Sequence, residues 1–255
     1  MRFFVGLHHP HVAGRFATAF ISVNALRRRK GAFPAQDWIM DSGAFSTIAK
    51  HGGYPEPVSE YAAEIRRWAA NGNLLAAVAQ DYMCEAWMLA KTGLTVADHQ
   101  RLTIERYDEL AANDTAGVCV MPVLQGFEPA EYVAHLRAYG TRLAPGAWVG
   151  VGSVCKRNGN AATIEAVLRA IKNERPDLRL HGFGLKTTAL ASEAVRELLD
   201  TADSMAWSYA ARRQGRDAND WTEARRFADL IETMPIQRRL FAQRASWRPA
   251  EAALA

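Results

Sequence analysis

The sequence predicts a single-domain (β/α)8 barrel, a TIM-like α/β fold, from three observations. Its 255 residues are a usual length for one α/β barrel. Eight short apolar, β-prone runs alternate with amphipathic segments, which indicates parallel strands joined by helices. Several runs end in a polar or glycine-rich group, and barrel enzymes build their active sites at the carboxyl ends of their strands. A doubly wound open sheet is the alternative architecture.

The predicted strands are short runs bounded by polar or glycine-containing segments. In chain order they are Arg2–Val5, Phe20–Val23, Trp38–Asp41, Leu75–Gln80, Val118–Leu124, Trp148–Gly152, Leu180–Gly184 and Ser204–Trp207. Residues 7–34 contain no clear helical pattern, so we expect the N-terminal units of the barrel to be irregular.

The segments between the strands carry apolar residues at helical spacing. In Val58–Ala70, for example, Tyr61, Ile65 and Trp68 recur on one face. From Trp221 onward we expect one or two closing helices, so that residues 220–255 form a helical C-terminal extension of a single domain spanning 1–255. The other predicted helices are Val96–Ala112, Pro129–Tyr139, Ala161–Asn173 and Ala189–Leu199.

The composition is that of a soluble globular protein, with 49% hydrophobic and 23% charged residues and a net charge of +4. No apolar stretch reaches the roughly 20 residues that span a bilayer, and the N-terminus reaches histidines too soon for a secretory signal. We therefore expect a cytoplasmic protein with no membrane contact. Its arginines crowd the last quarter of the chain, which suits phosphate binding or a solvated basic surface.

Three cysteines, Cys84, Cys119 and Cys155, are widely spaced and form no CxxC pair. This spacing argues against a disulfide framework and against a zinc knuckle. We expect no metal site and no cofactor, and we interpret Cys119, which lies in an apolar run, as a reduced core thiol.

Polar groups at the predicted strand ends form the candidate site. Each also has a structural interpretation: Asp41 as a turn cap, Asp81 in an ion pair, Gln125 bonded to loop backbone, and Asp203 as a helix N-cap. Their recurrence at equivalent strand ends favours a shared pocket. The groups are Asp41-Ser42-Gly43, Gln80-Asp81, Gln125-Gly126, Gly150-Val151-Gly152, His181-Gly182-Phe183-Gly184 and Asp203-Ser204.

These residue types suit recognition of a purine and chemistry at its sugar. A carboxylate such as Asp81 can accept from N1–H and N2–H, while Gln125 and the Gly152 backbone N–H can donate to O6. Phe45, Tyr82, Met205 and Trp207 are candidates for stacking, although ordinary core packing is expected for at least two of them. Two further carboxylates, Asp41 and Asp203, suit nucleophilic and acid–base catalysis.

Several segments resemble the tRNA-guanine transglycosylases. Asp41-Ser42-Gly43-Ala44-Phe45 is similar to their DSGGF segment, Val123-Leu124-Gln125-Gly126 to their VQG segment, and Val149-Gly150-Val151-Gly152 to their glycine-rich loop. Asp203-Ser204-Met205-Ala206-Trp207 resembles the stretch that carries the nucleophile in archaeal members, whereas an alignment to bacterial members would put Ala206 at that position. The likeness covers roughly Trp38 to Arg213.

The resemblance implies a role for each matching residue. Asp203 would be the nucleophile that forms a covalent glycosyl intermediate, and Asp41 the general acid/base. Asp81, Gln125 and Gly152 would recognise the base. Base-binding residues on the pocket wall would be Ser42, Gly43, Phe45, His181 and Phe183.

The chain also departs from the tRNA enzymes, because no cysteine or histidine follows Asp203 and their zinc site is therefore absent. It resembles more closely the compact deazapurine DNA-modification proteins of the DpdA type. His8-His9-Pro10, Val151-Gly152-Ser153-Val154-Cys155 and His181-Gly182-Phe183-Gly184-Leu185-Lys186 are similar to segments of that group, with the histidines as site residues or as structural residues bonded to loop backbone.

The resemblance implies a DNA-guanine transglycosylase that replaces guanine with a 7-deazaguanine such as preQ0. Predicted phosphate contacts are Lys156, Arg157, Lys186, Arg212 and Arg213. The alternatives are a transglycosylase or N-glycosidase acting on tRNA or on 7-deazaguanine nucleosides, and a non-catalytic partner subunit. A homodimer or a helper protein is a further expectation.

Overall fold

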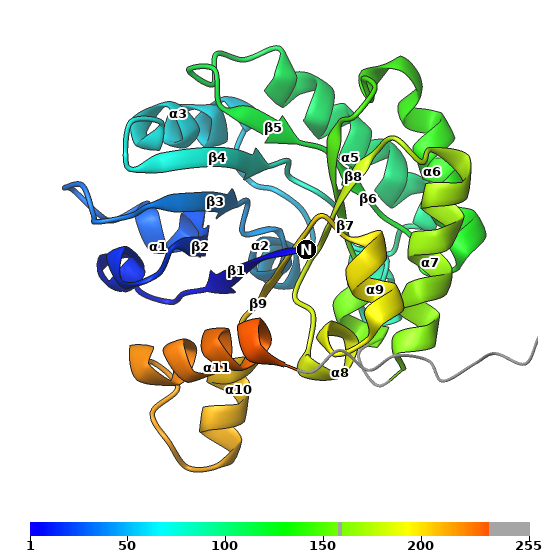
Figure 1. The fold of residues 1–255 in the computed structure, drawn as a ribbon. Helices are drawn as coiled ribbons and strands as arrows, with labels where there is room; N and C mark the ends of the chain where they lie inside the picture. Colours follow the sequence, from blue (N-terminus) through cyan, green and yellow to red (C-terminus); the bar gives the residue numbers. More distant parts are fainter. Residues whose placement is uncertain (158–159, 235–255) are drawn as a thin grey trace, which may run out of the picture.

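A computed structural model describes residues 1–157 and 160–234, with Lys156 described by its main chain alone. Within these residues the fold is a parallel α/β barrel with helices packed outside the strands (Figure 1). The strands are β1 (Arg2–Gly6), β2 (Thr18–Ser22), β3 (Asp37–Asp41), β4 (Asn73–Val78), β5 (Cys119–Met121), β6 (Val123–Leu124), β7 (Trp148–Val151), β8 (Arg179–Gly182) and β9 (Thr201–Ser204). The prediction of a TIM-like barrel is confirmed.

The sheet follows the chain around the barrel in the order β5-β4-β3-β2-β1-β9-β8-β7-β6, and the pairings among the described strands are parallel. β5 and β6 are two halves of one strand position, separated by Pro122. The first half pairs with β4, where the Ala79 N–H donates to the Met121 carbonyl at 2.9 Å. The second pairs with β7, where the Gly150 N–H donates to the Pro122 carbonyl at 2.8 Å. The predicted run Val118–Leu124 thus completes an eight-position barrel.

The helices outside the barrel match the prediction closely in the middle of the chain. They are α1 (Val23–Leu26), α2 (Ala44–His51), α3 (Val58–Trp68), α4 (Ala86–Thr92), α5 (Val96–Ala111), α6 (Pro129–Tyr139), α7 (Ala161–Glu174), α8 (Thr187–Leu190), α9 (Glu193–Leu198), α10 (Ala206–Arg213) and α11 (Trp221–Thr233). Short 3-10 helices span Pro10–Arg15, Gly140–Arg142 and Val154–Arg157. The N-terminal units are irregular, as expected.

Two predicted elements are wrong. The run Ser204–Trp207 is not a strand, because β9 already ends at Ser204 and Ala206 begins α10. Trp207 is therefore a buried residue of α10, and its indole N–H donates to the Gly6 carbonyl at 2.8 Å. The predicted helix Ala189–Leu199 is two short helices, because the Ser192 side chain caps a new start by accepting from the Val195 N–H.

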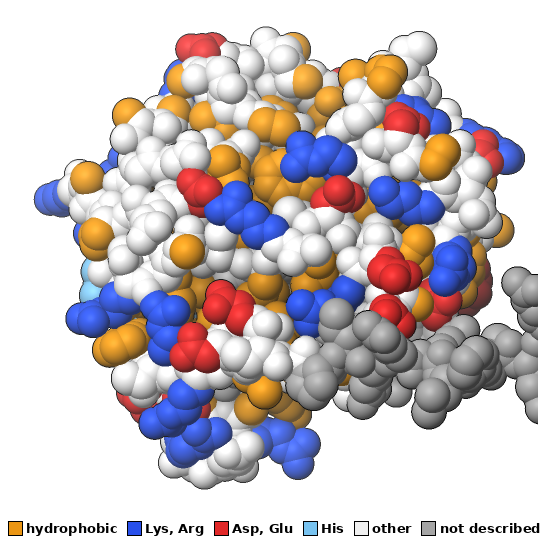
Figure 2. Space-filling model, viewed as in Figure 1, with side chains coloured by type: hydrophobic (Ala, Val, Ile, Leu, Met, Phe, Trp, Pro, Cys, Tyr) orange, Lys and Arg blue, Asp and Glu red, His pale blue; other side chains and the backbone are white. Residues whose placement is uncertain are grey.

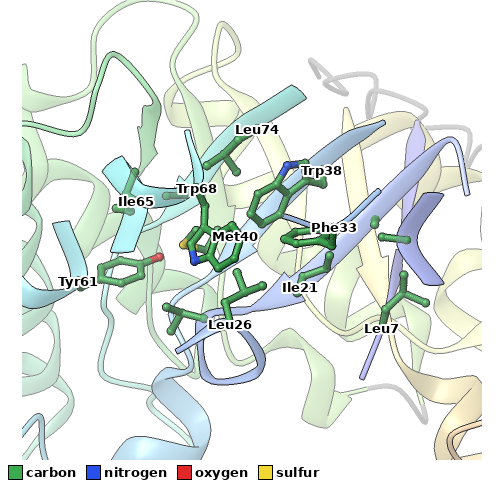
Figure 3. Packing of buried hydrophobic residues seen from close by; sticks show 14 of the residues in the cluster. Leu7, Ile21, Leu26, Phe33, Trp38, Met40, Tyr61, Ile65, Trp68 and Leu74 are labelled. Atoms are coloured by element: carbon green, nitrogen blue, oxygen red, sulfur yellow. The ribbon is translucent and has the colours of Figure 1, made fainter. Parts of the chain in front are cut away.

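The core has two layers, one between strands and helices and one inside the barrel. In the outer layer Phe33 packs against Trp38 and Trp68, with ring centroids 5.3 Å and 5.4 Å apart, respectively (Figure 3). Alternation along each strand sends the next residue inward. The barrel interior is filled by Phe4, Phe20, Ile39, Ala76, Val78, Met121 and Val123. This apolar plug occupies the barrel below the strand ends, so a ligand site is left at the carboxyl face.

The last described helix, α11, packs against β1. Phe227 of α11 packs edge-on against Phe3, with 5.9 Å between ring centroids. Residues 235–255 of the predicted extension lie outside the described part. Cys119 is exposed at the first residue of β5, so its interpretation as a core thiol is wrong. None of the described helices is long and apolar enough to cross a membrane.

Candidate active site

A cavity of about 530 Å³ opens at the carboxyl ends of the strands. Its floor is apolar, formed by Phe20, Val78 and Phe183, which lie at the top of the barrel plug. Its walls are polar and come from segments far apart in the chain. They include the predicted residues Asp41, Asp81, Gln125, Gly152 and Asp203.

Asp41 is the last residue of β3 and faces the cavity. Its Oδ2 accepts the Gly43 backbone N–H at 3.1 Å. Burial raises the pKa of Asp41 to about 6, hydrogen bonds from Ser22 and from the Gly43 and Ser42 backbone oppose that rise, and the charge of Asp203 adds to it. A carboxyl with this pKa can take up and release a proton near neutral pH.

Ser42 and Gly43 connect Asp41, the last residue of β3, to the start of α2. Gly43 has φ 72° at the start of α2, and a Cβ there would lie 2.4 Å from Asn24 Nδ2. Ser42 is buried, and neither residue lines the cavity. The base-binding role of Ser42 and Gly43 stays a prediction, whereas Phe45, in the first turn of α2, does line the cavity.

Asp81 ends a one-way chain of hydrogen bonds. The Cys84 backbone N–H donates to Ser153 Oγ at 3.0 Å, and the Ser153 hydroxyl donates to Gln125 Oε1 at 2.8 Å. The Gln125 amide nitrogen then donates to Asp81 Oδ2. Because a backbone N–H only donates, each later group in the chain has one orientation. One N–H of Gln125 remains for a ligand.

The environment of Asp81 disfavours its charge. Burial raises the pKa of Asp81 to about 7, the hydrogen bond from Gln125 opposes the rise, and the charges of Asp41 and Glu85 add to it. Its side chain is therefore part protonated near neutral pH. A ligand that offers two N–H donors would favour the ionised form.

Gly152 lines the cavity, but both its main-chain groups are used. Its N–H donates to the Leu124 carbonyl at 2.9 Å, and its carbonyl accepts from the Tyr132 hydroxyl at 2.7 Å. This N–H is therefore already engaged within the barrel, and its donation to a purine O6 stays a prediction. The missing side chain is what matters here, because a Cβ would lie 2.1 Å from Gln125 Nε2. Glycine lets Gln125 occupy the wall.

Asp203, near the end of β9, terminates a second one-way chain. The Trp148 indole N–H donates to Thr201 Oγ1 at 2.9 Å, and Thr201 Oγ1 lies 2.9 Å from His181 Nδ1. His181 Nε2 lies 3.2 Å from Asp203 Oδ1. An indole only donates and an ionised carboxylate only accepts, so the Thr201 hydroxyl donates to Nδ1 and the hydrogen of the neutral imidazole is on Nε2.

The Gly184 backbone N–H donates to the same Asp203 oxygen, Oδ1, at 3.0 Å. No donor among residues 1–157 and 160–234 binds Oδ2, which keeps its lone pairs for a ligand. His181 itself is fully buried at the level of Thr201 and does not line the cavity. In this arrangement the imidazole orients Asp203, and a base contact by His181 stays a prediction.

The four stacking candidates divide evenly. Phe45 and Met205 line the cavity, Tyr82 packs in a small buried cluster with Met83 and Met88, and Trp207 packs in the outer core. Phe183 belongs to the cavity floor, where its ring centroid lies 4.8 Å from that of His181.

The predicted phosphate contacts belong to the segments that follow β7, β8 and β9. Lys186, Arg212 and Arg213 are exposed, and the Arg157 guanidinium lies 4.3 Å from the centre of the Phe127 ring. The side chain of Lys156 lies outside the described part. On the face shown in Figure 2, Lys and Arg gather over α10 and α11 together with acidic side chains. The phosphate role of these residues stays a prediction.

A model of the family DpdA, described as "DeoxyPurine in DNA protein A", matches residues 1–231. The chain belongs to the DpdA family. No protein with a curated description matches it. The match covers all of the barrel strands and α10, so the whole cavity described above lies within the family match. Membership of the DpdA family supports a role in deazapurine DNA modification.

The sequence did not single out several wall residues of this DpdA barrel. Ser22 pairs in register with Asp41 and ends β2, so the strand-end rule applies to it as well. Glu85 lies four positions after Asp81 as the N-cap of α4, so it does not follow a predicted strand directly and the strand-end pattern does not point to it. Asn24 and Glu85 both line the cavity. Of the two N-terminal histidines that the sequence did indicate as candidates, His8 lines the cavity, with its Nε2 2.7 Å from Ser208 Oγ, whereas His9 is exposed.

Proposed function

We propose that this protein is a DNA-guanine transglycosylase, which exchanges guanine in DNA for a 7-deazaguanine such as preQ0. The observation that supports it most directly is one cavity with carboxylates on three sides and an apolar floor. A flat purine suits the floor formed by Phe20 and Phe183 and the side chain of Phe45.

Recognition is assigned to the wall formed by Asp81 and Gln125. Ionised Asp81 accepts from N1–H and N2–H of the base, and the remaining amide N–H of Gln125 donates to O6. Both guanine and a 7-deazaguanine present this edge, so one wall serves the leaving base and the entering base.

Catalysis is assigned to Asp203 and Asp41. Asp203 Oδ2 attacks C1′ of the target nucleotide, the C1′–N9 bond breaks, and the departing guanine takes the proton of Asp41. The entering 7-deazaguanine then loses its N9 proton to Asp41, and its N9 forms a bond to C1′ as the ester to Asp203 breaks. The exchange needs no oxidant, reductant or metal.

The test is base exchange. The purified protein is incubated with preQ0 and, separately, duplex DNA, single-stranded DNA, tRNA or nucleosides, and the digested nucleosides are identified by mass spectrometry. We expect a 7-deazaguanine deoxynucleoside in the DNA samples alone. A modified ribonucleoside in tRNA, or free base released from nucleosides, would replace this proposal by the alternative substrates. No exchange in any sample would leave a binding subunit as the better description.

A further inference from the structure

Four of the large apolar side chains most exposed to solvent lie on the cavity face. Phe45 (49% exposed), Trp87 (42%), Phe127 (40%) and Tyr209 (58%) belong to the segments that follow β3, β4, β6 and β9. Only Leu230 on α11 has comparable exposure among the described residues. Exposure of large aromatic rings costs free energy in water, so their collection at one end of the barrel indicates a contact surface.

These aromatic residues connect directly to the cavity walls. Phe45 lines the cavity, and its ring centroid lies 5.4 Å from that of Trp87, edge to face. Phe127 comes two residues after Gln125, and Tyr209 follows Ser208, which bonds to His8 of the cavity wall. We define Trp87, Phe127 and Tyr209 as the aromatic rim.

Cationic groups accompany two members of the rim. The Arg157 guanidinium stacks over Phe127 at 4.3 Å, and that of Arg213 lies 6.0 Å from the centre of the Tyr209 ring. A surface of rings with adjacent guanidinium groups can stack on bases and neutralise phosphates at once. In a duplex the faces of the bases are covered by their neighbours, so that only unpaired nucleotides can use such a surface.

We propose that the aromatic rim binds single-stranded DNA, stacking on the unpaired nucleotides next to the guanine in the cavity. This inference rests on the proposed function and specifies its substrate. A single strand also avoids the cost of extracting the target base from a duplex, which is a few kcal/mol.

The experiment measures affinity for a fluorescently labelled DNA strand with one guanine, alone and as a duplex with its complement, at matched salt and without preQ0. We expect the wild-type protein to prefer the single strand. Each of Trp87→Ala, Phe127→Ala and Tyr209→Ala should weaken single-strand binding about tenfold, with little effect on the duplex. Leu230→Ala, a matched exposed position on α11, should change neither affinity.

Two further variants separate stacking from charge. Trp87→Phe keeps an aromatic face and should recover most of the affinity that Trp87→Ala loses. The slope of log affinity against log salt should stay unchanged in the aromatic variants, whereas Arg213→Gln should reduce it by about 0.7. Equal affinity for duplex and single strand, or wild-type affinity in all three alanine variants, would overturn the inference.

The same samples distinguish this inference from the proposed function. Asp203→Asn should bind the single strand as tightly as the wild-type protein while losing base exchange. If exchange takes place but the rim variants bind normally, the rim inference fails and the transglycosylase proposal stands. If no exchange is found but single-strand binding depends on the rim, the rim inference stands and the transglycosylase proposal fails.

Discussion

Asp81 and Asp203 occupy opposite sides of the cavity, four strand positions apart in the barrel, and their surroundings differ in one respect. Both side chains are almost fully buried, at 7% and 5% exposure, and both end a one-way chain of hydrogen bonds. Asp81 receives one amide N–H and lies near two other carboxylates. Asp203 receives a backbone N–H and an imidazole on the same oxygen.

Because both side chains are buried, the two carboxylates differ chiefly in the hydrogen-bond donors that they receive. One side holds a carboxyl whose pKa is raised to about 7, suited to respond to the donors of a base. On the other side, two donors hold Oδ1 of Asp203. Its second oxygen, Oδ2, keeps its lone pairs for a ligand and suits attack at carbon. Three substitutions test this division.

The largest effect is expected on the Asp203 side. Asp203→Asn removes the nucleophilic oxygen, and we expect base exchange to fall on the order of 10⁴-fold. Asp229→Asn, an exposed position on α11, is the matched control and should retain full exchange. The measurement is the rate of preQ0 incorporation into DNA, and a fall of less than tenfold would contradict the assignment of Asp203 as nucleophile.

The next effect concerns stability and comes from Asp81. Its pKa rises from an ordinary 3.8 to about 7 on folding. Between these pH values the folded state holds a proton that the unfolded state has lost, so this group stabilises the fold at low pH and the stabilisation is lost as the pH rises through about 7. We expect Asp81→Asn to raise the free energy of unfolding at pH 8, by up to about 4 kcal/mol.

Urea unfolding at pH 5.5 and pH 8 measures this difference. The gain from Asp81→Asn should be larger at pH 8, while base exchange should be impaired at both because Asn cannot accept from both N1–H and N2–H as an anion does. Asp229→Asn should show no such pH dependence. An equal loss of stability at both pH values would mean that the chain from Ser153 through Gln125 requires a carboxylate.

The smallest effect is expected from the hydrogen bonds behind Asp203. Thr201→Val removes the group that accepts from Trp148 and donates to His181, so the imidazole loses its fixed tautomer. A lost orienting bond of about 1–3 kcal/mol corresponds to roughly a 5- to 150-fold lower exchange rate.

Thr201→Ser is the control because it keeps the hydroxyl, and it should restore most of the rate. The rate is measured with saturating preQ0 across pH, where the loss in Thr201→Val should appear in kcat rather than in KM for the base. Equal rates for the valine and serine variants would show that the orientation of Asp203 does not depend on this chain.

Most of the fold and part of the site could be predicted from the sequence, for a physical reason that particular residues show. Parallel strands in a barrel all end at one face, so polar groups after apolar runs, such as Asp41, Asp81 and Gln125, had to lie near one another. Short apolar runs are ambiguous, however. Ser204–Trp207 has strand-like composition but begins a helix, because only packing against β1 decides how Trp207 is buried.

The sequence by itself therefore determined the barrel, its direction and the set of strand-end carboxylates, since these follow from periodicity and chain order. The tertiary structure decided which of those groups face the ligand and which support them. His181 lies inside the barrel beside Thr201 and so orients Asp203, and the Gly152 N–H is used by Leu124. Both outcomes depend on hydrogen bonds between residues far apart in the chain, which only strand pairing and register bring together.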